Sequence, residues 1–252
     1  MGSVYSVKEV FYSLQGEGAR SGRPAVFCRF SGCNAWSGRG LDKADSACPF
    51  CDTDFVGVDG QNGGKYELDN LVNLLISLWP QDNNCKSKPY VVFTGGEPLL
   101  YANDPILVSF LEYLHQNGHR ITFETNATLS VDCESFPVFK ECIYALSVKL
   151  TNSAESYKKR VNPDVIHSLA TNSKEAFFKF SIDADSIDLA LDEEIEEIIS
   201  HAPDLEVYCM PVGGSKEEVE KNTEPLIEFC KAKGYSFSDR LHIRIWDQNK
   251  GV

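Results

Sequence analysis

The sequence is short of basic residues and has no apolar run long enough to cross a bilayer. Its 252 residues include 24 Lys and Arg against 37 Asp and Glu, which gives a net charge of -13. Such a charge repels phosphate backbones and anionic lipids, so we expect no nucleic-acid partner and no membrane partner. The first residues also lack the basic segment and apolar stretch of a secretory signal, and we expect a cytoplasmic protein.

The sequence also lacks the paired cysteines of a disulfide framework. It has nine cysteines, an odd number, in a chain long enough to bury a core without covalent staples. Six of them are isolated, and several lie in apolar runs, where Cys behaves as a small hydrophobic residue. We interpret these six as structural: Cys28, Cys85, Cys133, Cys142, Cys209 and Cys230.

Strand-like and helix-like segments alternate along most of the chain. Short apolar segments predict seven strands, at residues 25–31, 90–94, 120–125, 143–148, 176–182, 205–210 and 241–246. Helical spacing predicts helices around 68–78, 106–114 and 195–199, and Pro225 is expected near a helix start. We therefore expect a single α/β domain over residues 1–252, whose parallel sheet is doubly wound or forms a complete or partial barrel.

One segment, at about residues 32–64, has no clear period and is rich in Gly, Asp, Ser and Asn. Loops of this length inside a compact domain are usually functional. Three cysteines in it, Cys33, Cys48 and Cys51, form a C-x14-C-x2-C pattern. Thiolates so placed can bind zinc or an iron-sulfur cluster, and the spacing alone leaves both of these, and unliganded thiols, open.

A second motif, Thr94-Gly95-Gly96-Glu97-Pro98, follows the predicted strand at 90–94. Paired glycines at the carboxyl end of a strand let the backbone approach a ligand closely, and Glu97 can accept a hydrogen bond from an amine. Ligands bind at that end of the strands in α/β sheets. An ordinary strand-to-helix turn would also explain a bare Gly-Gly pair.

Together, the three cysteines and the downstream Gly-Gly-Glu-Pro resemble the radical S-adenosylmethionine (AdoMet) superfamily. The long gap between the first two cysteines is similar to that of a subgroup of its 7-carboxy-7-deazaguanine synthases. The opening Leu14-Gln15-Gly16-Glu17 and Arg29 resemble the same family, as do Glu124-Thr125-Asn126 and Ser147-Val148-Lys149. The resemblance implies a partial (β/α) barrel with its active site at the carboxyl ends of the strands.

The resemblance also implies which residues hold which group, and no catalytic residue beyond these ligands. It places a 4Fe-4S cluster on Cys33, Cys48 and Cys51, with one iron left for AdoMet, and Mg2+ on Thr53. The positions that match AdoMet contacts are Phe50, Cys51, Asp52, Gly95, Gly96, Glu97, Ser147, Val148 and Lys149. The positions that match substrate contacts are Leu14, Gln15, Gly16, Glu17, Arg29, Thr94, Glu124 and His242.

The implied reaction converts 6-carboxy-5,6,7,8-tetrahydropterin to 7-carboxy-7-deazaguanine with loss of ammonia, a carbon-nitrogen lyase step in queuosine biosynthesis. The implied partners are an electron donor such as flavodoxin or ferredoxin and a second copy of the chain in a homodimer. A radical AdoMet activase is one alternative, but Arg29 and the Leu14–Glu17 opening favour a small carboxylated substrate. A zinc-binding interaction module is the other, and it would not need the Gly-Gly-Glu motif.

Overall fold

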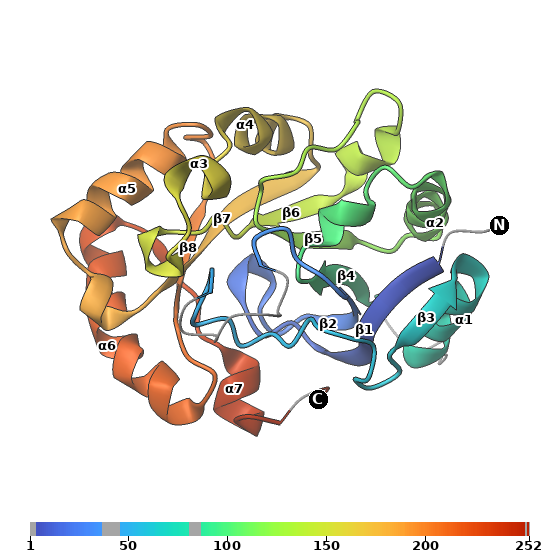
Figure 1. The fold of residues 1–252 in the computed structure, drawn as a ribbon, viewed down its shortest axis with the longest axis horizontal. Coiled ribbons are helices and arrows are strands. Elements are labelled where there is room, and N and C mark those ends of the chain that lie inside the picture. Colours follow the sequence, from blue (N-terminus) through green and yellow to red (C-terminus); the bar gives the residue numbers. More distant parts are fainter. Residues whose placement is uncertain (1–3, 37–45, 81–86, 250, 252) are drawn as a thin grey trace.

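The computed structural model describes residues 4–36, 46–80, 87–249 and 251. Cys85 and residues 37–45 of the predicted cluster loop lie outside the described residues. Within them, the chain forms one nine-stranded sheet in the order β3-β1-β2-β4-β5-β6-β7-β8-β9 (Figure 1). The strands are β1 (Val4–Leu14), β2 (Pro24–Phe30), β3 (Gly64–Glu67), β4 (Tyr90–Gly95), β5 (Ile121–Thr125), β6 (Ile143–Leu146), β7 (Glu175–Ile182), β8 (Val207–Pro211) and β9 (Ser236–Phe237).

Helices follow most of the strands and surround the sheet (Figure 1). They are α1 (Leu68–Leu78), α2 (Pro105–Gln116), α3 (Tyr157–Arg160), α4 (Pro163–Thr171), α5 (Leu189–Ile199), α6 (Lys216–Lys233) and α7 (Leu241–Trp246). None of the helices in the described ranges is both long and apolar enough to cross a membrane.

The sheet is mostly parallel and does not close. From β2 to β9 each strand is parallel to the next in the sheet, whereas β1 pairs antiparallel with β2 and β3. Because β3 and β9 form its two edges, the predicted α/β fold with a partial barrel is confirmed. The carboxyl ends of the parallel strands therefore meet at one end of an open barrel.

A row of buried aromatic rings joins the central strands on the side that faces the helices. Phe93 in β4 lies at the centre of this row, with its ring centroid 5.9 Å from that of Phe30 and 5.3 Å from that of Phe123. Phe123 in turn stacks on Tyr144 at 5.8 Å. These rings share one apolar core with Leu71 of α1 and the other inward residues of the helices. Each fully buried ring contributes about 2 to 3 kcal/mol of hydrophobic stabilisation.

Six of the seven predicted strands are confirmed, with ends shifted by one or two residues, and the seventh is wrong. Residues 241–246 form α7, in which the N–H of Arg244 donates to the carbonyl of Arg240 at 3.0 Å. The alternating apolar pattern suggested a strand, yet only Ile243 of this segment is buried. The segment is held beside the β1–β2 connection because the N–H of Leu241 donates to the carbonyl of Gly16 at 2.9 Å.

Pro225 lies inside α6, so its expected place near a helix start is also wrong. The helix begins after Ser215, whose hydroxyl accepts from the N–H of Glu218 at 3.3 Å. It ends at Gly234, whose φ of 74° suits a left-handed cap. The caps and the buried apolar residues between them keep the helix continuous, although Pro225 removes one of its hydrogen bonds.

Candidate active site

A cavity of about 530 Å³ opens at the carboxyl ends of the parallel strands. Its walls come from β1 and the turn after it, from the loop at 46–61, from the ends of β4 to β8, and from α7. All but two of the predicted site residues line it: Leu14, Gln15, Gly16, Glu17, Arg29, Cys33, Cys48, Phe50, Cys51, Asp52, Thr53, Thr94, Gly95, Gly96, Glu124, Ser147, Lys149 and His242. The two that do not are Glu97 and Val148, which are buried behind the wall.

The three cysteines of the C-x14-C-x2-C pattern converge on this cavity. Cys48 has a φ of 57°, and its carbonyl accepts from the N–H of Cys51 at 2.8 Å, which turns both residues toward the same wall. Burial raises the pKa of the Cys48 thiol, Lys149 lowers it, and the nearby Cys51 and Cys33 raise it further. The thiols are thus close enough to interact electrostatically, which suits one shared cluster.

The acidic, histidine and cysteine side chains of the described residues do not form a site for a single metal ion. Among the described residues, no three Cys, His, Asp or Glu side chains are grouped so as to hold one ion. Burial raises the pKa of the Cys33 thiol, whereas backbone N–H groups of Ala35 and Trp36 lower it by stabilising the thiolate. All eight cysteines within the described part of the chain are free thiols.

The paired glycines pack against the segment that leads to Cys33. Gly95 has a φ of 132°, and a Cβ there would lie 2.2 Å from the carbonyl oxygen of Phe30. The N–H of Glu97 donates to the carbonyl of Gly32 at 2.9 Å. The motif therefore holds the end of β4 directly beside the residue that precedes Cys33, the first cysteine of the C-x14-C-x2-C pattern.

Glu97, a predicted AdoMet contact, has a carboxylate that accepts hydrogen bonds from the chain itself. It is fully buried and accepts from the N–H of Leu99 at 3.0 Å, the hydroxyl of Thr125 at 2.8 Å and the N–H of Asn126 at 2.7 Å. The side chain of Asn126 then donates to Asn34, next to Cys33, at 2.8 Å. Glu97 thus ties the ends of β4 and β5 to the cluster loop.

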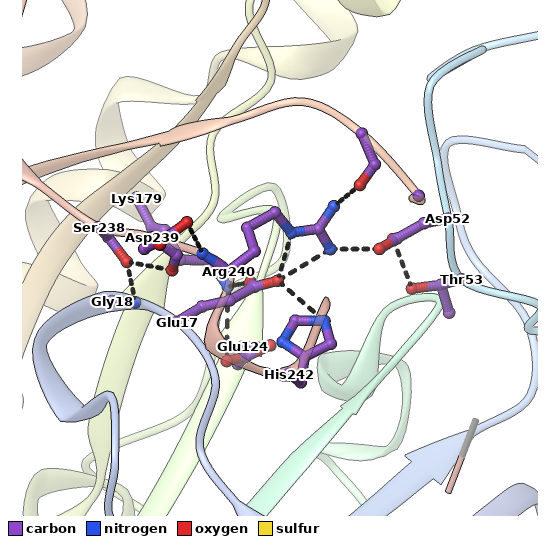
Figure 2. Close-up of polar contacts among 12 residues, drawn as sticks. Glu17, Gly18, Asp52, Thr53, Glu124, Lys179, Ser238, Asp239, Arg240 and His242 are labelled. Atoms are coloured by element: carbon purple, nitrogen blue, oxygen red, sulfur yellow. Dashed lines mark hydrogen bonds and ion pairs between the residues drawn. The ribbon is translucent and has the colours of Figure 1, made fainter. Parts of the chain in front are cut away.

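A buried group of charges lines the cavity around Glu17, and its contacts are drawn in Figure 2. Lys179 of β7 donates to Glu17 Oε2 at 2.9 Å, and the Nε of Arg240 donates to Glu17 Oε1 at 3.0 Å. Arg240 also donates to Asp52 and to the carbonyl of Gly213. Burial alone would raise the pKa of Glu17, but Lys179 and Arg240 hold it well below its usual range.

Predicted substrate contacts meet at Glu124, at the end of β5. The amide nitrogen of Gln15 donates to Glu124 Oε1 at 2.9 Å, and the hydroxyl of Thr94 donates to Oε2 at 3.4 Å. His242 lies on the other side of Glu17, with its Nε2 3.7 Å from Glu17 Oε1. Burial lowers the pKa of His242, so this imidazole is neutral near pH 7.

Arg29 of β2, the register partner of Thr94 in β4, is oriented by a carboxylate of the neighbouring strand β1. Its Nε donates to Glu9 Oε1 at 2.8 Å, and its Nη1 lies 3.5 Å from the hydroxyl of Thr53. Glu9 therefore fixes the guanidinium through one edge and leaves the terminal nitrogens facing the cavity. The predicted magnesium residue and the predicted carboxylate-binding residue are brought side by side.

The loop that carries Thr53 is tied to β1 by a buried lysine. Lys8 Nζ donates to Asp54 at 2.8 Å, to Asp59 at 2.7 Å and to the carbonyl of Val56 at 2.9 Å. These three acceptors lie within six residues of one another in a segment without helix or strand. Lys8 therefore determines how that segment lies over the cavity.

Sequence reasoning did not find Glu9, Lys179 or Arg240. A lysine within the apolar run Phe177-Phe178-Lys179-Phe180 was the one available signal, since a buried charge needs a partner. Arg240 had no such signal, because it lies 223 positions from Glu17.

The chain matches no family model, but it is similar to curated proteins named 7-carboxy-7-deazaguanine synthase. The protein of Burkholderia multivorans is 54% identical over 129 residues, which cover 51% of this chain and 58% of the relative. That of Bordetella pertussis is 52% identical over 127 residues, 50% of this chain and 57% of the relative. These alignments thus span less than two thirds of either relative. The protein of Rhodopirellula baltica is 28% identical over 261 residues, 98% of this chain and 88% of the relative.

Two solved structures are similar in fold. A crystal structure of QueE from Escherichia coli superposes with a TM-score of 0.63 at 20% identity and covers 95% of each chain. Streptococcus suis SuiB, bound to its precursor peptide SuiA, has a TM-score of 0.50 at 14% identity and covers 77% of this chain and 46% of SuiB. The resemblance inferred from the motifs is therefore confirmed in both sequence and fold.

Proposed function

We propose that the chain is a 7-carboxy-7-deazaguanine synthase, which converts 6-carboxy-5,6,7,8-tetrahydropterin to 7-carboxy-7-deazaguanine with loss of ammonia. It would thus act as a carbon-nitrogen lyase in queuosine biosynthesis. One observation carries this proposal: a single cavity is lined by all three cluster cysteines and by every predicted substrate contact. The similarity to curated synthases over 98% of the chain supports it.

The cofactors of this proposal are a 4Fe-4S cluster on Cys33, Cys48 and Cys51, with AdoMet beside it. Bound together, they supply a carbon radical that removes a hydrogen atom from the substrate. The ammonium of Lys149 acts on Cys48 and favours its thiolate. Lys149 would therefore offset the negative charge that three thiolates bring to the wall.

The substrate carboxylate would bind at Arg29 and Thr53. The guanidinium is held at Nε by Glu9, so its terminal nitrogens can take a planar carboxylate bidentately. The hydroxyl of Thr53 would hold Mg2+ as a neutral oxygen ligand, with substrate oxygens as further ligands. The charge of Arg29 and of the cation would together compensate the carboxylate.

The pyrimidine edge of the pterin would bind at Glu124 and Gln15, since Glu124 on β5 lies two strands from Arg29 on β2 in the sheet. Glu124 offers carboxylate oxygens to ring N–H donors, while Gln15 and Thr94 orient that carboxylate. A substrate held at both ends would have a fixed position for C6, the ring carbon that bears the carboxylate and loses the hydrogen atom. Positioning of this kind is the main contribution a protein makes to cofactor chemistry.

The proposal includes a cytoplasmic homodimer that takes its electron from a flavodoxin or a ferredoxin. The first test is anaerobic reconstitution with iron and sulfide, followed by dithionite, AdoMet, Mg2+ and 6-carboxytetrahydropterin. We expect cluster absorbance, 5'-deoxyadenosine and the deazaguanine product. AdoMet cleavage without consumption of the pterin would contradict the proposed substrate. Stoichiometric zinc without iron would favour a zinc-binding interaction module instead.

A matched pair of variants sharpens this test. Cys33→Ala should lose iron and sulfide, because a cluster ligand is removed. Cys28→Ala removes a fully buried thiol within β2 that does not line the cavity, so it should retain iron. Equal iron contents in the two variants would contradict the cluster ligands proposed here.

A further inference from the structure

Lys179 places a buried ammonium between two carboxylates of the candidate site (Figure 2). Its side chain is 5% exposed, and its Nζ lies 2.9 Å from Glu17 Oε2 and 3.4 Å from Glu124 Oε1. Burial alone would lower the pKa of Lys179, but Glu124 and Glu17 raise it. The ammonium is therefore charged at neutral pH and compensates two buried anions at once.

The two carboxylates differ in how many hydrogen bonds their oxygens can still accept. Both oxygens of Glu17 are taken by the chain's own cations, Oε2 by Lys179 and Oε1 by Arg240. Glu124 has one ion pair within the described residues, the one with Lys179. Its Oε2 receives only a long contact of 3.4 Å from the hydroxyl of Thr94. A carboxylate has about four lone-pair sites, so Glu124 keeps acceptor capacity toward the cavity that it lines.

The ion pair of Glu124 decides how that capacity is oriented. Arg240 is already shared between Glu17 and Asp52, so it does not compensate Glu124. Without Lys179, Glu124 would lose its ion pair, and its Oε1 would be held by the amide of Gln15 alone among the described residues. A carboxylate that can turn no longer presents its oxygens in one fixed direction, so it would select less well for a pair of adjacent donors.

We propose that Lys179 is a specificity-determining positioning residue, which holds the Glu124 carboxylate in place as the acceptor for the adjacent N–H donors of a 2-amino-4-oxopyrimidine ring. The inference rests on the proposed pterin substrate. It adds to that proposal the feature that distinguishes a 2-amino ring from its 2-oxo analogue. Glu17 serves this arrangement by orienting the ammonium rather than by binding the ring.

The test compares two oxidised probes, 6-carboxypterin and 6-carboxylumazine, which differ in the 2-amino and 2-oxo groups. Dissociation constants are measured by calorimetry on the reconstituted protein with AdoMet and Mg2+ but no reductant, so turnover does not intervene. We expect the wild type to bind the pterin at least about tenfold more tightly, because the 2-oxo group would face a carboxylate oxygen. Lys179→Met should bring this ratio close to one, and Lys179→Arg should retain most of it.

Glu124→Gln tests the same link from the other side. It should also lower the ratio, and adding Lys179→Met to it should cause no further loss, because both changes act on the same acceptor. The matched control is Lys221→Met on α6, which removes an exposed ion pair with Asp185 and should leave the ratio unchanged. Iron content per chain checks that each variant is folded.

The outcomes separate this inference from the proposed function. If Lys179→Met retains iron and keeps the wild-type ratio, or if its effect adds to that of Glu124→Gln, the inference is overturned and the pterin substrate stands. If Lys179→Met does not fold, the test rests on Lys179→Arg keeping the ratio and Glu124→Gln losing it. If the wild type binds neither probe, the proposed substrate itself is wrong.

Discussion

A Cβ atom added at Gly96 would lie 1.8 Å from the carbonyl oxygen of Gly32 and 2.7 Å from the nitrogen of Cys33. The backbones that follow the two strands are thus in direct contact. The same carbonyl of Gly32 accepts a hydrogen bond from the N–H of Glu97. Gly-Gly motifs are usually explained by the approach of a ligand. Here the close approach is first of all between two parts of the protein.

Gly96→Ala should therefore displace the segment that carries Cys33 and lower the iron content of the reconstituted protein. The backbone on the other side cannot give way without breaking β2–β4 pairing, so the cysteine loop moves. Gly214→Ala is the matched control, because its Cβ would meet Asp52 at an ordinary 3.7 Å. Iron and sulfide per chain are the measurement. A Gly96→Ala protein with a full cluster would show that the loop accommodates the methyl group.

Thr53→Val should weaken the response to magnesium without affecting the cluster. Valine keeps the shape of threonine but removes the hydroxyl that would bind the cation. We expect turnover to fall at least about tenfold at low magnesium, the cost of one charge-assisted contact. Thr171→Val at the exposed end of α4 is the control. An unchanged magnesium titration in Thr53→Val would rule out this ligand.

Glu17 should control stability in acid. Its pKa is lowered well below the ordinary value of 4.5 by Lys179 and Arg240, against the effect of burial. A lowered carboxyl pKa contributes stability that is present above about pH 4.5 and is lost as the pH falls through the folded-state value. Glu17→Gln should cost about 3 kcal/mol at pH 7 and then lose less stability than the wild type below pH 4.5.

Urea denaturation across this pH range measures the effect of Glu17. The control is Glu228→Gln, whose carboxylate is 64% exposed in an ion pair with Lys231 on α6. Its free energy of unfolding should follow that of the wild type at every pH. Parallel curves of unfolding free energy against pH for Glu17→Gln and the wild type would mean that the pKa of Glu17 is the same in the folded and unfolded states.

Pro225→Ala should stabilise the protein. The proline lies in the middle of α6, where it removes a donor and crowds the preceding turn, and alanine is favoured there by up to about 3 kcal/mol. Pro163→Ala is the control, because Pro163 occupies the first turn of α4, where no donor is needed. Chemical denaturation should show a higher midpoint than that of the wild type for Pro225→Ala and an unchanged midpoint for Pro163→Ala. Equal midpoints would mean that α6 bends to relieve the proline.

The parallel strands β2 and β4 to β8 could be predicted because each is a short apolar segment between turn residues, whereas β9 has only two residues and no such signal. β1 could not, since its burial does not alternate: Lys8 and Glu9 are both buried in mid-strand, each held by partners distant in sequence. α7 could not either, because its pattern fits a strand and its position depends on Gly16.

The residues of the candidate site also include some that could be predicted from the sequence and others that could not. Cys33, Cys48 and the Gly95-Gly96 pair belong to local motifs that resemble those of the radical AdoMet superfamily, so their common place in the cavity could be predicted. The ion pairs of Glu17 depend on residues from β7 and α7, and only the folded chain brings these together. Sequence therefore predicted which side chains line the cavity but not what compensates their charge.

The first and last parts of the described chain meet at this cavity. The N–H of Gly18 donates to the hydroxyl of Ser238 at 2.7 Å across 220 positions, and Arg240 completes the ion pairs of Glu17. Synthesis proceeds from the N-terminus, so residues 14–53 leave the ribosome long before their partner at 240 exists. The ion pair between Glu17 and Arg240 can thus form only after residue 240 has been translated. The wall of the cavity around Glu17 is therefore completed late in the folding of this protein.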